Sequence, residues 1–375
     1  MAFFLSTGGA EGQSASCDCG STPGTVTGLE LQWNGVTTES FHDALAMLTP
    51  LGCSLKRLKL EGNRLAGYLP GTALALFRNV TRPGLSSNRL TGPVPQQLGT
   101  LPLLRVLDLT KNDLSGPVPK DLCLYNRSSP SRLIGLMLSS NRLNGTSDVP
   151  YCGALVNLDI GNNMFESFGN FTGWRSLQIM RWNNQTQIKS QPILPSMVDS
   201  EPLVDWSAAS SGLTGPIPAF VAAMTALGAV NLGRNQLTGT LPSDLFINAG
   251  SLVSLNLAVN QLTGTLPPEM ALTPSHSYKY QRNLLHGTIP EVFHKFVKPG
   301  FEMRLDNNHL FCCGTGTTGS GTSLSYTGVN YSAPRLPSFL RQSTLKKHML
   351  LEPEFAALED SAGLSVPVAQ WGAMR

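Results

Sequence analysis

The clearest pattern in the chain is a short alternation of leucine and polar residues that recurs with a fixed period. Within residues 227–267 the chain repeats itself after 25 residues, as Leu227, Val230, Leu232, Asn235, Leu237, Gly239 and Leu241-Pro242, then Leu252, Leu255, Leu257, Asn260, Leu262, Gly264 and Leu266-Pro267. A fixed period in the range of about 20–50 residues is typical of a solenoid.

Each part of the repeat predicts a local structure. The Leu-x-x-Leu-x-Leu run ends in strict alternation and indicates a short strand with one buried face. The following Asn suits a tight bend, because its amide can bond backbone groups there and in the next turn. Gly permits the unusual dihedral angles of the return path, and Pro argues against a long helix on the far side. One turn cannot bury its own leucines, so we expect the turns to stack around a continuous core.

The Asn position can be followed through most of the chain. It recurs as a predicted ladder of Asn63, Asn88, Asn112, Asn141, Asn163, Asn235, Asn260, Asn283 and Asn308. Val26, Leu29, Leu31 and Asn34 form an opening turn, and a helical insert is expected at about residues 39–48. Between about residues 166 and 210 the pattern weakens, with Gln185 and Ser211 at the Asn position and Trp182 and Trp206 at leucine positions. We interpret both tryptophans as core residues, in preference to a surface aromatic site, and count twelve turns.

These residues resemble the plant-type leucine-rich repeat, whose pattern is L-x-x-L-x-L-x-x-N-x-L-x-G-x-I/L-P. The resemblance implies an α/β, β-rich solenoid: a right-handed, curved superhelix with a parallel sheet on its concave face and short 3-10 or β segments on its convex face. The domains expected are an N-terminal segment and cap (1–25), the solenoid (26–313), a Gly/Ser/Thr-rich linker (314–334) and a partly disordered C-terminal tail (335–375).

Composition restricts the class of protein. The net charge is +3 and charged residues make up 14% of the chain, so the balance does not indicate a nucleic-acid partner. No run of about 18 apolar residues is present, so we expect no membrane span in this chain. The apolar run near the start, Ala2 to Leu5, is shorter than a signal peptide needs. Either the signal is missing from this chain or the protein stays inside the cell.

The seven cysteines are Cys17, Cys19, Cys53, Cys123, Cys152, Cys312 and Cys313. By resemblance to the family, the pairs at the two ends would belong to disulfide-bonded caps; the alternative is free thiols in a reduced cytosol. Cys123 and Cys152 each lie 11 residues after a ladder asparagine. Counted in this way, the two cysteines are neighbours in consecutive turns and could form a disulfide bond. Counted from Pro119 and Pro150, the two cysteines are two positions out of phase, so the spacing does not decide whether they form a disulfide bond.

Six N-glycosylation sequons are present, at Asn79, Asn126, Asn144, Asn170, Asn184 and Asn330. They suit a secreted protein and would have no meaning in cytosol. No motif of a zinc protease, redox dithiol, serine hydrolase or P-loop occurs, and no histidines are spaced as metal ligands. We therefore expect a non-enzymatic protein with no catalytic residues, cofactor or metal site.

The register of the repeats predicts which residues point outward from the concave face. In the early turns six of them are basic and two acidic; those taken as partner-binding are Lys56, Arg57, Lys59, Arg82, Arg105, Asp108 and Lys111. The middle turns are expected to be almost uncharged. We therefore hypothesise that the first third of the concave face binds an acidic partner, a protein surface or an acidic glycan, with an ordinary solvated surface as the alternative.

The sequence thus favours a recognition protein that binds a protein, peptide or acidic glycan through its concave face. By resemblance it would be extracellular or at the cell surface and would act in signalling or defence. The alternative is an intracellular structural scaffold in the cytoplasm, the cytoskeleton or the axoneme of a cilium. The identity of the ligand does not follow from a repeat motif.

Overall fold

This computed structural model describes residues 26–38, 40–126, 129–147, 149, 151–169, 174–193, 202–275, 277–290, 292–295 and 302–311. The predicted N-terminal segment, linker and C-terminal tail, together with Cys17, Cys19, Cys312, Cys313, Asn170 and Asn330, lie outside the described residues. Within them, no helix is long and apolar enough to cross a membrane.

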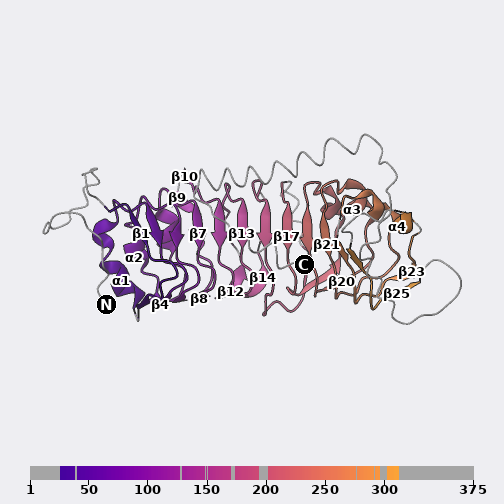
Figure 1. Cartoon of the computed structure of the whole chain (residues 1–375), viewed down its shortest axis with the longest axis horizontal. Helices are drawn as coiled ribbons and strands as arrows, with labels where there is room; N and C mark the ends of the chain where they lie inside the picture. Colours follow the sequence, from indigo (N-terminus) through magenta and orange to yellow (C-terminus); the bar gives the residue numbers. More distant parts are fainter. Residues whose placement is uncertain are drawn as a thin grey trace.

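The fold is a solenoid built on one twelve-stranded parallel sheet, as predicted (Figure 1). Its strands are β1 (Gly28–Glu30), β3 (Arg57–Lys59), β5 (Pro83–Gly84), β7 (Val106–Asp108), β11 (Gly135–Met137), β13 (Asn157–Asp159), β15 (Ile179–Arg181), β17 (Asp205–Ser207), β19 (Ala229–Asn231), β21 (Ser254–Asn256), β22 (Ser277–Lys279) and β24 (Glu302–Arg304). The middle residue of each three-residue strand points inward, as Leu58, Leu107 and Leu255 show, each at most 1% exposed. Alternation therefore leaves the first and third residues on the outer face.

Most turns continue into a second strand. These strands form a six-stranded sheet of β2 (Thr37–Thr38), β4 (Arg64–Tyr68), β6 (Arg89–Gly92), β8 (Asp113–Gly116), β12 (Arg142–Ser147) and β14 (Met164–Phe168). Further along the chain β16 (Gln191–Pro192), β18 (Leu213–Pro216) and β20 (Gln236–Thr238) form another, and β23 (His286–Thr288) pairs with β25 (His309–Phe311). The second layer is interrupted where the repeat pattern weakens, whereas the twelve-stranded sheet continues.

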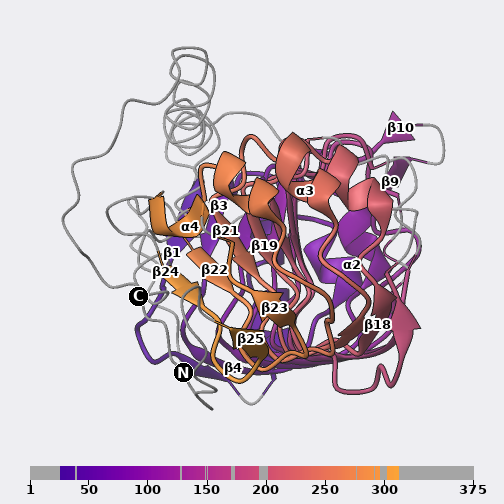
Figure 2. The same ribbon diagram turned by 90° about the vertical axis from the view of Figure 1, so that its right-hand side faces the viewer.

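Short helices complete the turns. They are α1 (Phe41–Ala46), α2 (Gly71–Leu74), α3 (Ser243–Asn248) and α4 (Val292–Lys295), with 3-10 segments at Thr49–Leu51, Gln96–Thr100, Ala219–Ala223 and Pro268–Leu272. An end-on view places α2 and α3 away from the strands of the long sheet (Figure 2). In the predicted helical insert, Phe41, Leu45 and Leu48 are all buried. Proline at the start of most of these segments fixes φ and keeps them short.

A ladder of asparagines, most of them buried, ties the turns together. Asn141 donates from Nδ2 to the carbonyls of Leu138 in its own turn (3.0 Å) and of Leu109 in the turn before (3.0 Å), and accepts from the N–H of Leu114 (3.0 Å). The same pattern of bonds recurs at Asn88, Asn112, Asn163, Asn260 and Asn283. Asn63, Asn235 and Asn308 bond the preceding turn likewise. The neighbour reached is therefore the preceding turn, not the next one as expected.

The residue before each ladder position adopts a left-handed conformation. Its φ lies between 52° and 70° in every turn from Trp33 to Asn307. Only one of these twelve residues, Gly62, is a glycine, so most turns accept a conformation that costs an L-residue roughly 1–2 kcal/mol. The bend is thus imposed by the ladder bonds and the strand register rather than by local preference.

The weakened region keeps its core by using larger side chains. Trp182 and Trp206 are at most 1% exposed, which confirms their interpretation as core residues, and Phe168 meets Trp182 edge to face. Gln185 and Ser211 replace the asparagine and bond the carbonyls of Ile160 (2.9 Å) and Trp182 (2.7 Å), respectively.

A disulfide bond joins Cys123 to Cys152, with their Cα atoms 5.2 Å apart. Counting from the ladder asparagines therefore gave the right register. Cys123 leads directly into an inserted antiparallel hairpin of β9 (Leu124–Asn126) and β10 (Ser129–Pro130), so the bond anchors this insertion to the next turn. Cys53 lies half-buried in an earlier turn.

Candidate functional site

The outward-pointing first and third residues of the twelve strands form a continuous surface, which we call the sheet face. It carries side chains that differ from turn to turn, whereas the inward residues are uniformly apolar. A surface of variable residues on a constant scaffold is suited to recognition.

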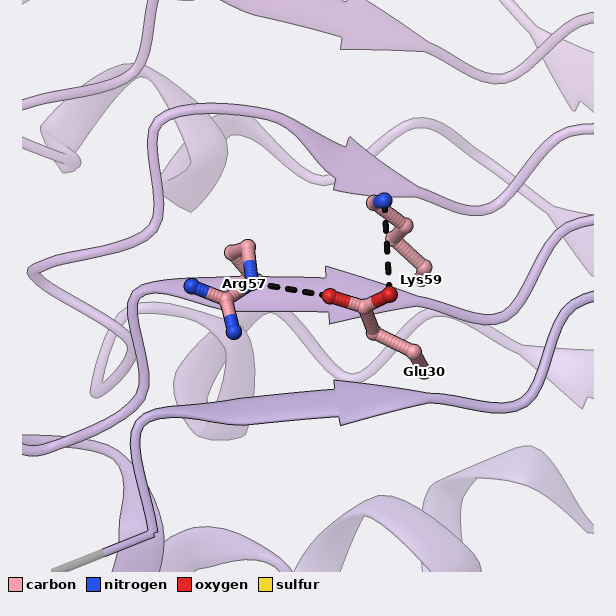
Figure 3. A network of polar contacts seen from close by, with 3 residues as sticks. All are labelled: Glu30, Arg57 and Lys59. Atoms are coloured by element: carbon pink, nitrogen blue, oxygen red, sulfur yellow. Dashed lines mark hydrogen bonds and ion pairs between the residues drawn. The ribbon is translucent and has the colours of Figure 1, made fainter. Parts of the chain in front are cut away.

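The first turns of the sheet face carry an ion-pair cluster rather than isolated cations (Figure 3). Arg57 Nε lies 2.8 Å from Glu30 Oε1, and Lys59 Nζ lies 3.4 Å from Glu30 Oε2. The pKa of Glu30 is lowered mainly by the hydrogen bond from Arg57; burial opposes this effect, and Lys59 adds to the lowering. The predicted ratio of six basic to two acidic residues omitted Glu30, which neutralises part of this patch.

The other residues predicted to contact a partner are spread over the next turns. Lys56 is exposed, and Arg82 and Arg105 are half-buried on the same side of the sheet. Asp108 accepts a hydrogen bond from the Thr110 N–H (3.1 Å). Lys111 is exposed, but its φ of 56° places it on the bend that follows the strand rather than on the strand itself.

The turns that follow the stretch predicted to be almost uncharged (Met137 to Asn162) carry a charge pair that sequence reasoning missed. Arg181 of β15 donates from Nε (3.1 Å) and Nη2 (2.7 Å) to Oδ2 of Asp205 on β17. Both residues flank tryptophans that stand at leucine positions, Arg181 beside Trp182 and Asp205 beside Trp206. Applying the register through these tryptophans would have placed both charges on the sheet face.

Asp159 of β13 completes this central group. Its Oδ1 accepts from the Gly161 N–H (3.1 Å) and its Oδ2 from the Ser139 hydroxyl (3.0 Å). Burial is the largest effect and raises the pKa of Asp159, although both hydrogen bonds and the nearby Arg181 oppose it. Arg181 therefore lies between two carboxylates, only one of which it contacts directly.

The last turns are polar and lightly charged. Ala229, Asn231, Ser254 and Asn256 present short side chains on β19 and β21, and Lys279 and Arg304 follow on β22 and β24. Arg304 is paired with Glu302 on its own strand (2.5 Å).

The described sequons differ in exposure. Asn144 and Asn184 are exposed, on β12 and on a bend beside the sheet face, respectively. Asn79 is half-buried, and its Nδ2 donates to the Cys53 carbonyl. Asn126 is the last residue of β9.

The described residues contain no group of three or more His, Cys, Asp or Glu side chains that could hold a metal ion. The sheet face offers hydrogen-bond donors, acceptors and ion pairs, but these groups are distributed over a broad surface. Such an extended solenoid surface is suited to binding an extended ligand.

Comparisons with known proteins agree with this architecture. A family model described as Leucine Rich Repeat matches residues 103–124 and 251–272. Receptor-like protein 32 of Arabidopsis thaliana is 30% identical over 203 residues, which are 52% of this chain and 22% of that protein.

Two solved structures with similar folds are plant receptors. The Arabidopsis receptor kinase HAESA, in complex with the peptide hormone IDA and the co-receptor SERK1, matches with a TM-score of 0.64 and 25% identity over 79% of this chain and 48% of that chain. The plant peptide hormone receptor RGFR1, in complex with RGF2, matches with a TM-score of 0.61 and 25% identity over 70% of this chain and 42% of that chain. The chain thus spans about a fifth of the curated relative and less than half of these two structures.

Proposed function

Because the chain is a leucine-rich-repeat protein of the plant type, we propose that it is a non-enzymatic recognition module that binds a peptide or protein segment on its sheet face. The observation that carries this proposal is the contrast between the uniform core and the variable sheet face. Twelve turns hold the same inward leucine-like positions, yet the outward positions change from cationic to mixed to polar along the sheet.

The similar receptor structures support a peptide in preference to other ligands. Both are complexes with peptide hormones, and both share 25% of aligned residues with this chain. The comparisons offer no support for an acidic glycan. The pairing of Arg57 and Lys59 with Glu30 also weakens the basic patch on which that idea rested.

An extracellular or cell-surface location accords with the Cys123–Cys152 disulfide, because structural disulfides persist mainly in oxidising compartments. A protein in reduced cytosol would be expected to keep both thiols free. The exposed sequons at Asn144 and Asn184 fit the same location.

The proposal is tested by panning the full chain, secreted from a eukaryotic host, against a library of random peptides about 12 residues long. Enriched peptides are then titrated by calorimetry against two variants. Ala229→Trp places a large side chain on β19 of the sheet face, whereas Thr238→Trp places it on the exposed side of β20 in the second layer.

Binding is expected to weaken at least about tenfold in Ala229→Trp and to be unchanged in Thr238→Trp. Failure to enrich any peptide, or an equal effect of both variants, would contradict the proposal. Circular dichroism of both variants confirms that the fold is kept.

A further inference from the structure

The third residue of each strand from β15 to β24 is a hydrogen-bond donor. These residues are aligned by the sheet register on six consecutive strands, and we call them the donor row: Arg181, Ser207, Asn231, Asn256, Lys279 and Arg304. No comparable run exists in the first half of the sheet, where the same position holds Glu30, Lys59, Gly84, Asp108, Met137 and Asp159.

Two asparagines at the centre of the donor row have a fixed orientation. Oδ1 of Asn231 accepts from the Gly233 N–H (3.3 Å), and Oδ1 of Asn256 accepts from the Ala258 N–H (3.1 Å). Since the oxygen of each amide is bound to the backbone, the Nδ2 group points the other way. Among the described residues, neither Nδ2 has an acceptor, so each amide presents free donors on the sheet face.

The residues beside these amides have small side chains. Ala229 and Ser254 are the outward neighbours on the same two strands, and Gly233 follows β19. A Cβ atom at Gly233 would lie 3.2 Å from Oδ1 and 3.3 Å from Nδ2 of Asn256, so a larger residue would press on that amide. A ligand main chain can therefore approach the two donors closely.

The two arginines at the ends of the donor row are both paired, whereas Lys279 is not paired within the described part of the chain. Arg181 is neutralised by Asp205, and Arg304 is paired with Glu302. Lys279 forms no ion pair with any described residue, and it lies directly across the ladder from Asn256. The row therefore has one unpaired cation beside its two free amides.

We propose that the donor row reads the main chain of an extended peptide that crosses β17 to β22. Main-chain carbonyls accept from Asn231 and Asn256, and a carboxylate of the peptide pairs with Lys279. Four strands at a spacing of about 4.8 Å span roughly 14 Å, which an extended peptide covers with four to five residues. Because every peptide residue has a main-chain carbonyl, the two amides contribute affinity whatever the peptide sequence. Lys279 adds a preference for peptides that carry a carboxylate. This inference rests on the proposed function.

The test uses the tightest peptide from the panning experiment and copies in which each carboxylate in turn is replaced by a carboxamide. Asn231→Ser and Asn256→Ser replace each free amide by a shorter hydroxyl that can turn back onto the sheet, as that of Ser207 on β17 does by donating to Asn183 Oδ1 (2.8 Å). Asn231→Asp and Asn256→Asp keep the bond to the backbone N–H, as Asp108 and Asp159 do at the matching positions, but lose the donor. The fold therefore tolerates both kinds of change.

Each Ser variant is expected to weaken binding about threefold to tenfold, for several unrelated peptides alike, and each Asp variant at least as much. Lys279→Ala is expected to weaken binding of the parent peptide by a similar factor. It should leave the affinity for one of the carboxamide-substituted peptides unchanged. If these variants bind normally while Ala229→Trp abolishes binding, the donor row is wrong and the proposed function stands. If no peptide binds the unmodified chain, the proposed function itself fails.

Discussion

In most turns a single asparagine carries out two tasks, because its amide holds both its own bend and the preceding turn. Asn141 is 8% exposed and makes its bonds to Leu109, Leu138 and Leu114 at 3.0 Å each. Replacement by alanine would leave buried backbone groups without partners. The ladder could be predicted from its spacing alone, but its direction could not, since a repeat looks the same read towards either neighbour.

Asn141→Ala is expected to lower the free energy of unfolding by about 2–4 kcal/mol, because the lost bonds are buried and unreplaced. Urea unfolding followed by circular dichroism measures the change. Asn248→Ala, at the exposed end of α3, is the matched control and should change stability by no more than about 0.5 kcal/mol. A similar effect of both substitutions would contradict the ladder account.

Val259 is the one β-branched residue among the left-handed positions, with φ of 59°. The equivalent positions hold asparagine in three other turns, at Asn162, Asn184 and Asn307. Val259→Asn should therefore relieve strain and stabilise the protein by about 1 kcal/mol, as measured by thermal unfolding. The reverse change, Asn162→Val, should destabilise it by a similar amount; stabilisation by that change would rule out the strain argument.

Asp159 makes stability depend on pH. Burial raises the pKa of its carboxyl above the ordinary value of 3.8, so the folded state binds this proton more tightly than the unfolded chain does. The stability that this proton provides is present at low pH and is lost as the pH rises through the raised folded-state pKa.

Asp159→Asn removes this pH dependence, and Asn already occupies the matching position in Asn231 and Asn256. The variant is expected to be more stable than the unmodified chain at about pH 7, and this gain in stability should disappear at about pH 3. Unfolding midpoints at the two pH values measure this difference. A variant that is less stable only at neutral pH would show that Arg181 and the hydrogen bonds outweigh burial.

At the scale of elements, the spacing of leucines predicted the strands of the long sheet, whereas the short β segments of the second layer were expected only by resemblance to the family. Strands such as β3 and β21 follow from the spacing of leucines, because alternation decides which residues are inward. The second layer, with β4, β12 and β20, has no comparable apolar signal, since its pairing depends on how the turns stack. The weakened region shows the same limit: Trp206 keeps the register of the core, although the pattern of leucines is lost.

The Cys123–Cys152 bond closes a segment with a sequence separation of 29 and fastens the inserted hairpin to the solenoid. Replacing both cysteines by serine is expected to lower the free energy of unfolding by about 3–4 kcal/mol. Thermal unfolding with and without reductant provides the measurement, and the unmodified chain should lose stability on reduction. A chain whose stability and mass do not change on reduction would contradict both the bond and the oxidising location.

At the scale of the whole molecule, the sheet face has a sequence of charges that no single turn reveals. The ion-pair cluster at Glu30, the central group around Arg181 and the donor row succeed one another along the sheet. The candidate site was predicted only in part, because a residue's neighbours across the sheet belong to other turns. Glu30 was overlooked as a partner of Arg57 for that reason, although both stood at outward positions.

Hydrogen–deuterium exchange of the full chain with and without its tightest peptide tests recognition through the sheet face. Exchange is expected to slow at the strands from β17 to β22 and at the bends that follow them, and to stay unchanged in the second layer and the helices. Protection confined to the second-layer strands β4, β6, β8, β12 and β14, or to the helices, would show that the ligand binds elsewhere. That result would contradict recognition through the sheet face.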